Sequence, residues 1–148
     1  MTQVAIKEVN KSNESEVRKV RLKPDQETFI ESVAECLEEA KEYPQWQPVA
    51  IYSHDKVVGF AMYGSFGPNK DTWIDRIIID KDYQGLGLGS EAMRHLIEIV
   101  SKRYGIRVIY LSIVEGNEVA AHLYNRLGFE YMNEKDPNGE RIYKHEID

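Results

Sequence analysis

The feature of the sequence that most constrains the fold is a run of three alternating glycines, Gly85, Gly87 and Gly89, between a β-rich segment at residues 73–80 and an amphipathic segment at residues 90–104. The apolar residues of the second segment recur at helical spacing, so the chain passes from a strand into a helix through the glycines. The N–H groups of such a turn converge with the positive end of the helix, and glycine lets an anion come close because it has no Cβ. The turn predicts a site for phosphate oxygens, and a tight connection that binds nothing is the alternative.

The other sequence patterns predict an α/β (α+β) fold with a mixed sheet and helices on both faces. Apolar or alternating runs mark the strands, and apolar residues three or four positions apart mark the helices. The expected strands are residues 4–9, 48–52, 56–63, 73–80, 108–114, 130–132 and 141–145. The expected helices are residues 14–19, 25–43, 90–104 and 117–127, with Asn13 capping the first and Gly128 ending the last. The run at 108–114 is broken only by Ser112, which is typical of a strand buried on both faces.

Length and charge limit the class of protein. Residues 1–148 have the length of one domain and contain no linker or repeat. The net charge of −6 disfavours a general affinity for nucleic acid or an anionic membrane. Without an apolar span or a secretory pattern, and with Cys36 as the single cysteine, we expect a cytoplasmic protein. The four histidines are scattered rather than clustered at zinc spacing, so we expect no metal.

Two common nucleotide-binding motifs do not fit the glycine turn. A Walker loop has a lysine after its last glycine, whereas Ser90 and Glu91 follow here. A Rossmann fingerprint has its third glycine one residue later and belongs to a repeated strand–helix–strand unit. The turn therefore indicates another kind of phosphate-bearing ligand.

The chain resembles the GNAT superfamily of acetyl-CoA-dependent N-acetyltransferases. The resemblance rests on Gln-x-x-Gly-x-Gly at residues 84–89, after a strand that carries an acid, and on Asn117 with Tyr124 seven residues later. It implies a single GNAT-like domain over residues 1–148 with a mostly antiparallel sheet. It also implies that the turn cradles the pyrophosphate of coenzyme A and that a neighbouring strand pairs with the pantetheine arm. The cofactor-binding residues that it implies are Ile77, Ile79, Gln84, Gly85, Leu86, Gly87, Leu88, Gly89, Ser90, Asn117 and Tyr124.

Acetyl transfer from a thioester to an amine needs a neutral amine. Neutralising a lysine-like amine of pKa about 10.4 at pH 7 costs about 4 to 5 kcal/mol, so a base is expected. Asp75 is the first candidate, and ideal strand alternation places its side chain on the face of Trp73 and Ile77. In the polyamine acetyltransferases of the family, an acid at the matching place is taken as a base or as an organiser of water. The alternative is an ion pair of Asp75 with Arg76 or with a cation from a loop.

Tyr124 is the candidate acid. A phenol of pKa about 10 can protonate a departing thiolate, whose thiol has a pKa of about 8.5. Seven residues are almost two helical turns, so Asn117 and Tyr124 can face the cofactor together. The alternative for Tyr124 is packing in the core. Direct attack by the amine requires no Ser-His-Asp or Cys-His set, and Cys36 is expected to be an ordinary buried residue.

The expected substrate is a polyamine such as spermidine or spermine. Residues 44–46, 58–63 and 73–76 resemble those of bacterial spermine/spermidine acetyltransferases, in which acids and aromatic rings line an amine channel. Acids concentrate a cation and aromatic rings can hold an ammonium, although a solvated helix face and core packing are their commoner uses. The candidate substrate-binding residues are Glu31, Glu35, Trp46, Tyr63, Trp73 and Asp75.

Other functions stay open on the sequence alone. The same chemistry could act on a protein N-terminus, an amino sugar or an antibiotic. A non-catalytic acetyl-CoA sensor would keep the glycine turn but need neither Asp75 nor Tyr124, and an interaction module would need no cofactor at all. Family members are often dimers, so a homodimer is an alternative to a monomer, although the sequence contains no evident self-complementary surface.

Overall fold

Seven strands form one sheet in the order β1-β2-β3-β4-β5-β7-β6 within the residues that the structure, a computed structural model, describes, which are 4–26 and 32–147. The strands are β1 (Val4–Glu8), β2 (Gln47–Ser53), β3 (Lys56–Phe66), β4 (Asp71–Ile79), β5 (Val108–Ile113), β6 (Glu130–Lys135) and β7 (Arg141–Glu146). The helices are α1 (Glu14–Val17), α2 (Val33–Glu42), α3 (Leu88–Tyr104) and α4 (Glu118–Arg126), with short 3-10 turns η1 (Pro24–Gln26) and η2 (Lys81–Tyr83). Neighbouring strands are antiparallel except for β4 and β5, which confirms the mixed, mostly antiparallel sheet.

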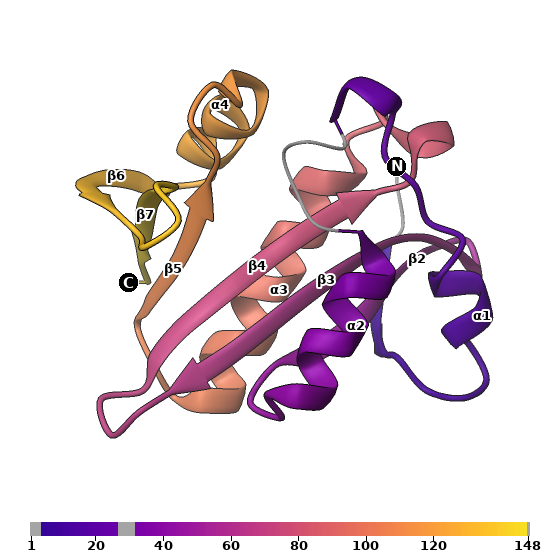
Figure 1. Ribbon diagram of the computed structural model, residues 1–148, viewed down its shortest axis with the longest axis horizontal. Helices are drawn as coiled ribbons and strands as arrows, with labels where there is room; N and C mark the ends of the chain where they lie inside the picture. The colour runs from indigo at the N-terminus through magenta and orange to yellow at the C-terminus, as the bar shows by residue number, and fades with distance from the viewer. Residues whose placement is uncertain (1–3, 27–31, 148) are drawn as a thin grey trace.

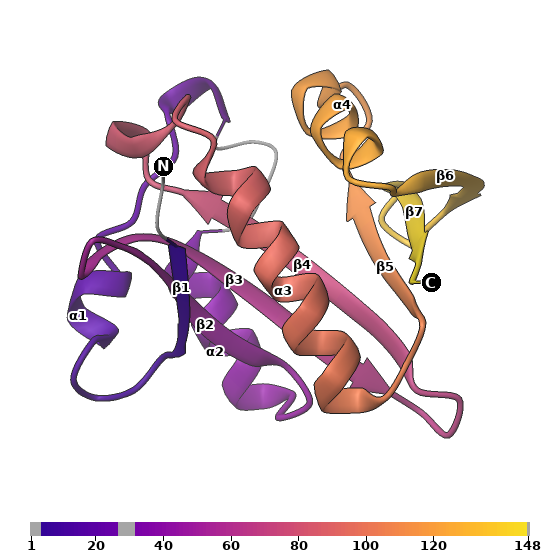
Figure 2. The same cartoon turned by 180° about the vertical axis from the view of Figure 1, so that it is seen from behind.

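Helices cover the sheet on both faces, as expected (Figures 1 and 2). On one face, α1 and α2 pack over an apolar cluster that includes Val17, Cys36 and Phe60, so Cys36 is a buried core residue. On the other face, Met93 and Leu96 of α3 pack in a second cluster. No helix of residues 4–26 and 32–147 is long and apolar enough to cross a membrane.

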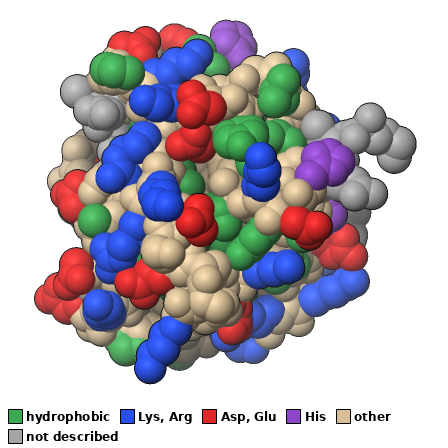
Figure 3. All heavy atoms as spheres, turned by 90° about the vertical axis from the view of Figure 1, so that its right-hand side faces the viewer, with side chains coloured by type: hydrophobic (Ala, Val, Ile, Leu, Met, Phe, Trp, Pro, Cys, Tyr) green, Lys and Arg blue, Asp and Glu red, His purple; other side chains and the backbone are tan. Residues whose placement is uncertain are grey.

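The surface around α1 mixes charges of both signs. Figure 3 shows basic and acidic side chains interspersed on this side of the molecule, with no single basic field. Within α1 the pairing is local, since Arg18 binds Glu14 at 2.9 Å and Lys19 binds Glu16 at 3.2 Å. This surface gives no support to a general nucleic-acid affinity.

The long acidic helix begins later than the sequence pattern predicts. We expected a helix over residues 25–43, whereas Pro24–Gln26 form a 3-10 turn and α2 begins at Val33. Ser32 and Glu35 form a capping box, in which Ser32 Oγ accepts from the Glu35 N–H at 3.2 Å and Glu35 Oε1 accepts from the Ser32 N–H at 3.1 Å. This reciprocal cap satisfies N–H groups that a continuing helix would satisfy, so it defines the start of α2.

Asn13 stands at the N-cap position of α1, but its side chain does not cap the helix. Instead, its Oδ1 accepts from the Asn10 N–H at 2.8 Å and its Nδ2 donates to the Glu8 carbonyl at 3.0 Å. The buried amide therefore ties the end of β1 to the start of the helix. The expected role of Asn13 is right in position and wrong in mechanism.

A β-bulge interrupts the alternation of β4. Met62 lies opposite Asp75 and Phe60 lies opposite Ile78, so a single β3 residue between them faces both Arg76 and Ile77. Arg76 takes a left-handed backbone conformation with φ of 54°, which re-aims the strand. The prediction that Asp75 shares a face with Ile77 is therefore wrong, because ideal alternation does not hold across the bulge.

The strand β5 is buried on one face only. Ile109, Leu111 and Ile113 are buried, whereas Tyr110 and Ser112 are half-buried. The prediction of a strand buried on both faces is wrong, because the side chains of the second face stay partly exposed. The register of β5 with β4 is limited to Trp73 opposite Tyr110, and the two parallel strands diverge beyond that pair (Figure 1).

Candidate functional site

A cavity of about 650 Å³ lies where β4 and β5 diverge, at the carboxyl ends of both strands. Ligands commonly bind at such a place in a sheet, because side chains and loops converge where parallel strands end. The structure brings together here most of the residues that the sequence singled out. The residues among them that line the cavity are Asp75, Ile77, Ile79, Gln84, Gly85, Gly87, Leu88, Gly89, Ser90, Asn117 and Tyr124.

The glycine turn presents backbone donors to the cavity. Gly85 and Gly87 have φ of 81° and 80°, a conformation that favours glycine, and Gly87 is the N-cap of α3. At this end of α3, the Glu91 N–H donates to the carbonyl of the N-cap residue Gly87 at 3.2 Å. The N–H groups that precede it have no carbonyl partner within the helix and carry its positive end, so they fit phosphate oxygens.

Gly89 has a different reason to be glycine. Its φ does not lie in the left-handed region, and a Cβ placed there would make only ordinary contacts, 3.7 Å from Ile79 and 3.9 Å from Leu123. The backbone alone therefore does not require glycine at this position. Close approach of a ligand to the start of α3 would require it.

Gln84 connects the glycine turn to the N-terminal part of the chain. Its side-chain amide exchanges two hydrogen bonds with that of Gln26, at 2.9 and 3.0 Å, and also donates to the Ile79 carbonyl at 2.9 Å. Sequence reasoning missed Gln26, because no local pattern links residues 58 positions apart. Leu86, which the resemblance placed at the cofactor, is 59% exposed and does not line the cavity.

The helix α4 carries Asn117 and Tyr124 along one side of the cavity. Asn117 is the N-cap, and its Oδ1 accepts from the Ala120 N–H at 3.3 Å, which leaves its NH₂ group available for other partners. Tyr124 packs edge-on against Phe129, with ring centroids 6.2 Å apart. Burial, and secondly the negative charge of Asp75, raise the pKa of Tyr124 to about 12. The phenol is therefore protonated at neutral pH and lies within electrostatic reach of Asp75.

Asp75 and Arg76 lie at the bulge of β4 and both line the cavity. The Asp75 carboxylate accepts from the Arg76 N–H at 2.9 Å, and its second oxygen lies 3.8 Å from the guanidinium. The guanidinium itself is held by Glu39 of α2, with distances of 2.8 and 3.1 Å. The alternative role expected for Asp75, an ion pair with Arg76, is seen as this contact of 3.8 Å.

The other sequence-predicted substrate residues that the structure describes do not line the cavity. Tyr63 is 3% exposed in the core beside α3, where its hydroxyl accepts from Arg103 at 3.2 Å. The carboxylate of Glu35 serves the Ser32 cap, whose hydrogen bonds lower the pKa of Glu35. Glu31 lies outside the described residues. These positions were predicted from residue type alone. In the structure, Tyr63 is part of the core and Glu35 caps α2.

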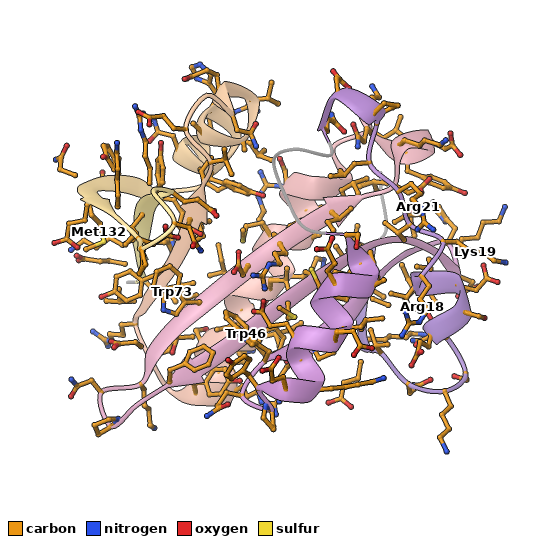
Figure 4. The ribbon with its side chains drawn as sticks, in the orientation of Figure 1. Arg18, Lys19, Arg21, Trp46, Trp73 and Met132 are labelled. Atoms are coloured by element: carbon orange, nitrogen blue, oxygen red, sulfur yellow. The ribbon has the colours of Figure 1, made fainter. Side chains whose placement is uncertain are left out.

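The two tryptophans flank the site rather than line it. Trp46 lies beside the C-terminal end of α2 and packs edge-on against Phe66, with ring centroids 4.8 Å apart (Figure 4). Trp73 lies opposite Tyr110 where β4 pairs with β5, and the centroids of the two rings are 5.4 Å apart. Trp73 thus packs at the closed end of the divergence, where the two strands are still paired.

The turn between β6 and β7 lines the cavity from the far side, which sequence reasoning missed. Asp136, Asn138 and Glu140 all border it, and Glu140 Oε1 accepts from the Ser112 hydroxyl at 3.2 Å. Glu115 does not line the cavity, and its hydrogen bond with Arg141 lowers its pKa.

No group of three or more His, Cys, Asp and Glu side chains in the described part of the chain is arranged to hold a metal ion. The donors that face the cavity are backbone N–H groups, a phenol, amides and guanidinium groups. These groups suit the oxygens of an anionic ligand.

Comparison with known proteins agrees with this arrangement. Residues 9–129 match the model of the family described as acetyltransferase (GNAT) family. A probable spermine N(1)-acetyltransferase from Bacillus subtilis subsp. natto (strain BEST195) is 40% identical over 150 residues, which cover 97% of this chain and 99% of the relative. The spermine/spermidine N(1)-acetyltransferase of Bacillus subtilis (strain 168) is 39% identical over the same shares. A solved spermidine N-acetyltransferase from Vibrio cholerae, in complex with CoA and spermine, has the same fold, with a TM-score of 0.74, 14% identity, and coverage of 96% of this chain and 93% of that chain.

Proposed function

The chain belongs to the acetyltransferase (GNAT) family and is an N-acetyltransferase, and from this premise we propose that it transfers the acetyl group of acetyl-CoA to a primary amine of a polyamine such as spermidine or spermine. The observation that carries the chemistry is the meeting of the glycine turn, Asp75 and Tyr124 in one cavity. The polyamine is supported by the full-length similarity to relatives named for spermine.

The residues of the cavity fit acetyl-CoA. The start of α3 and the glycine turn offer N–H donors to the pyrophosphate, and the free NH₂ of Asn117 can donate to an amide of the pantetheine arm. The edge of β4 near Ile77 and Ile79 faces the same space and can pair with that arm. When bound, acetyl-CoA supplies a thioester carbonyl for attack by an amine.

Asp75 serves as the base. An amine of pKa about 10.4 arrives protonated, and a carboxylate in the cavity wall can take its proton directly or through a water molecule. Attack is direct, because the amine and the thioester meet in one cavity and no covalent relay through the protein is needed. Asp75 also attracts the cationic amine before it reacts.

Tyr124 stabilises the leaving sulfur. Its pKa of about 12 keeps a proton on the phenol oxygen throughout the neutral range. This value lies above the pKa of about 8.5 of an ordinary thiol, so Tyr124 acts best as a hydrogen-bond donor while negative charge develops on sulfur. If the phenol gives its proton to the sulfur, the proton that the amine releases then returns to the phenol oxygen.

The experiment that tests the proposal is a thiol-release assay with acetyl-CoA and a panel of amines. Spermidine and spermine should give the highest kcat/KM, and an amino sugar, an aminoglycoside and a peptide N-terminus should give at least about tenfold less. A better rate with one of those amines would replace the polyamine. No thiol from any amine, together with stabilisation by about 2.7 kcal/mol at 100 times the Kd of acetyl-CoA, would indicate a sensor instead.

We also propose that the enzyme works in the cytoplasm, which is supported by the single, buried cysteine. A homodimer is the alternative to a monomer. The oligomeric state is tested by light scattering, in which a mass of 17.1 kDa would indicate a monomer.

A further inference from the structure

Arg76 places a permanent positive charge in the wall of a cavity proposed to receive a cation. Arg76 lines the cavity together with Asp75, and its side chain is only 13% exposed. Arginine stays protonated in proteins, so its charge cannot be removed by titration. Left uncompensated, this group would repel an incoming ammonium and would offset the attraction of Asp75.

Glu39 compensates that charge from the far side. It reaches from α2 and binds the guanidinium in a two-pronged pair, at 2.8 Å from Nη1 and 3.1 Å from Nη2. The planar guanidinium matches a carboxylate in this geometry, so both its position and its charge are held. The Trp46 ring, 6.0 Å away, adds a further contact to the same group.

We propose that Glu39 is a positioning residue of the amine site, which acts through Arg76 and makes the cavity accept polycations. By holding and neutralising the guanidinium, which lies 3.8 Å from Asp75, it weakens the repulsion that Arg76 would exert on a cation in the cavity. This inference rests on the proposed function, since it assumes an amine substrate. It goes further in predicting that the penalty for losing Glu39 grows with the number of charges on the amine.

The first test is Glu39→Gln, which keeps the shape of the side chain and removes its charge. We expect kcat/KM to fall about tenfold for spermidine, more for spermine, and only about twofold for butylamine, a monoamine, with the change mainly in KM. At 0.5 M NaCl the loss for spermidine should shrink to about threefold, because salt screens the repulsion. An equal loss for all three amines would overturn the proposal.

Two further variants separate charge from folding. Glu38→Gln removes a charge from the same helix at an exposed carboxylate that lies 3.6 Å from Lys41, and it should leave the ratio of the three amines unchanged. The double variant Glu39→Gln with Arg76→Gln removes both charges and keeps an amide pair. Its kcat/KM for spermidine should be at least about three times that of Glu39→Gln. No increase would mean that the pair only supports the fold.

Calorimetry keeps the inference separate from the proposed function. Spermidine and butylamine are titrated into wild-type protein and into Glu39→Gln, each saturated with coenzyme A. If wild-type protein releases no thiol yet binds spermidine, and the variant binds it about tenfold more weakly, the proposed reaction fails and the role of Glu39 stands. Equal spermidine affinity in the two proteins, including no binding by either, would overturn the role of Glu39.

Discussion

The two flanks of the cavity use different chemical groups, backbone N–H groups on one and charged side chains on the other. The cofactor flank, residues 84–90 at the start of α3, offers backbone N–H groups fixed by a short stretch of sequence. The amine flank, formed by Asp75 and Arg76 with Glu39 behind the guanidinium, offers side-chain charges from two distant parts of the chain. The cofactor flank should therefore fail through changes in backbone conformation, and the amine flank through changes in charge.

Damage to the cofactor flank should have the largest effect. Gly87→Val forces a β-branched residue into φ of 80° at the N-cap of α3, so the turn must rearrange and its N–H donors are lost. Losing two charge-assisted hydrogen bonds should weaken acetyl-CoA binding about 1000-fold, as measured by calorimetry.

The matched control for Gly87 is Gly67 in the turn between β3 and β4. It has φ of 75° and open space around its Cα, and it does not line the cavity. Gly67→Val should lower stability by a similar 1 to about 2 kcal/mol while changing the Kd of acetyl-CoA less than about twofold. Equal Kd values for the two variants would show that the glycine turn does not bind the cofactor.

Tyr124 lies between the two flanks, and Tyr124→Phe should separate chemistry from binding. The variant keeps the ring packed against Phe129 and removes only the hydroxyl. We expect kcat to fall about 100-fold, with the Kd of acetyl-CoA within about twofold of wild type. An unchanged kcat would remove Tyr124 from the reaction.

The raised pKa of Tyr124 also predicts a pH dependence. The phenol loses its proton only as the pH approaches about 12, rather than near its usual value of about 10. Its contribution to kcat should therefore persist up to at least about pH 11, and the ratio of wild-type to Tyr124→Phe rates should stay constant from pH 7 to pH 10. A ratio that falls between pH 8 and pH 10 would show that the phenol ionises earlier.

Asp75→Asn tests the amine flank and should have a smaller effect. It removes the proton acceptor but leaves a polar group at the bulge, and water can still take up the proton. We expect kcat/KM at pH 7 to fall about tenfold and the acidic limb of the pH–rate profile to move or disappear. A profile of unchanged shape would show that Asp75 is not the base, and Glu140, another carboxylate in the cavity wall, would be tested next.

Ser32→Ala should have the smallest effect on activity. It removes the capping box of α2 and should lower the free energy of unfolding by about 1 kcal/mol, which shifts Tm by about 3 °C. Because α2 carries Glu39, KM for spermidine should rise by about twofold while the Kd of acetyl-CoA stays the same. A larger change in the Kd of acetyl-CoA than in KM would break the distinction between the two flanks.

The same contrast explains what the sequence could predict. The strand order along the chain, the glycine turn and the spacing of Asn117 and Tyr124 are local patterns, and the structure brings these residues to one cavity. The start of α2 was also readable from Ser32 and Glu35, but the regular glutamates around the box suggested a longer helix.

The amine flank depends on contacts that no local pattern encodes. The bulge at Arg76 arises from the pairing of β3 with β4, and Glu39 and Arg76 are 37 positions apart. Tyr63 looks like an amine-binding aromatic until its neighbours in the core are known. Residue type predicted the chemistry of this flank, but only the tertiary structure identifies which residues supply it.

By separating inside the molecule, β4 and β5 solve a problem of solubility. Beyond Trp73 and Tyr110 the facing edges of the two strands no longer pair with each other. On the outside of a protein such edges invite a neighbouring chain and lead to aggregation. Here they face each other across the cavity, so a ligand with amide groups that enters it can pair with them.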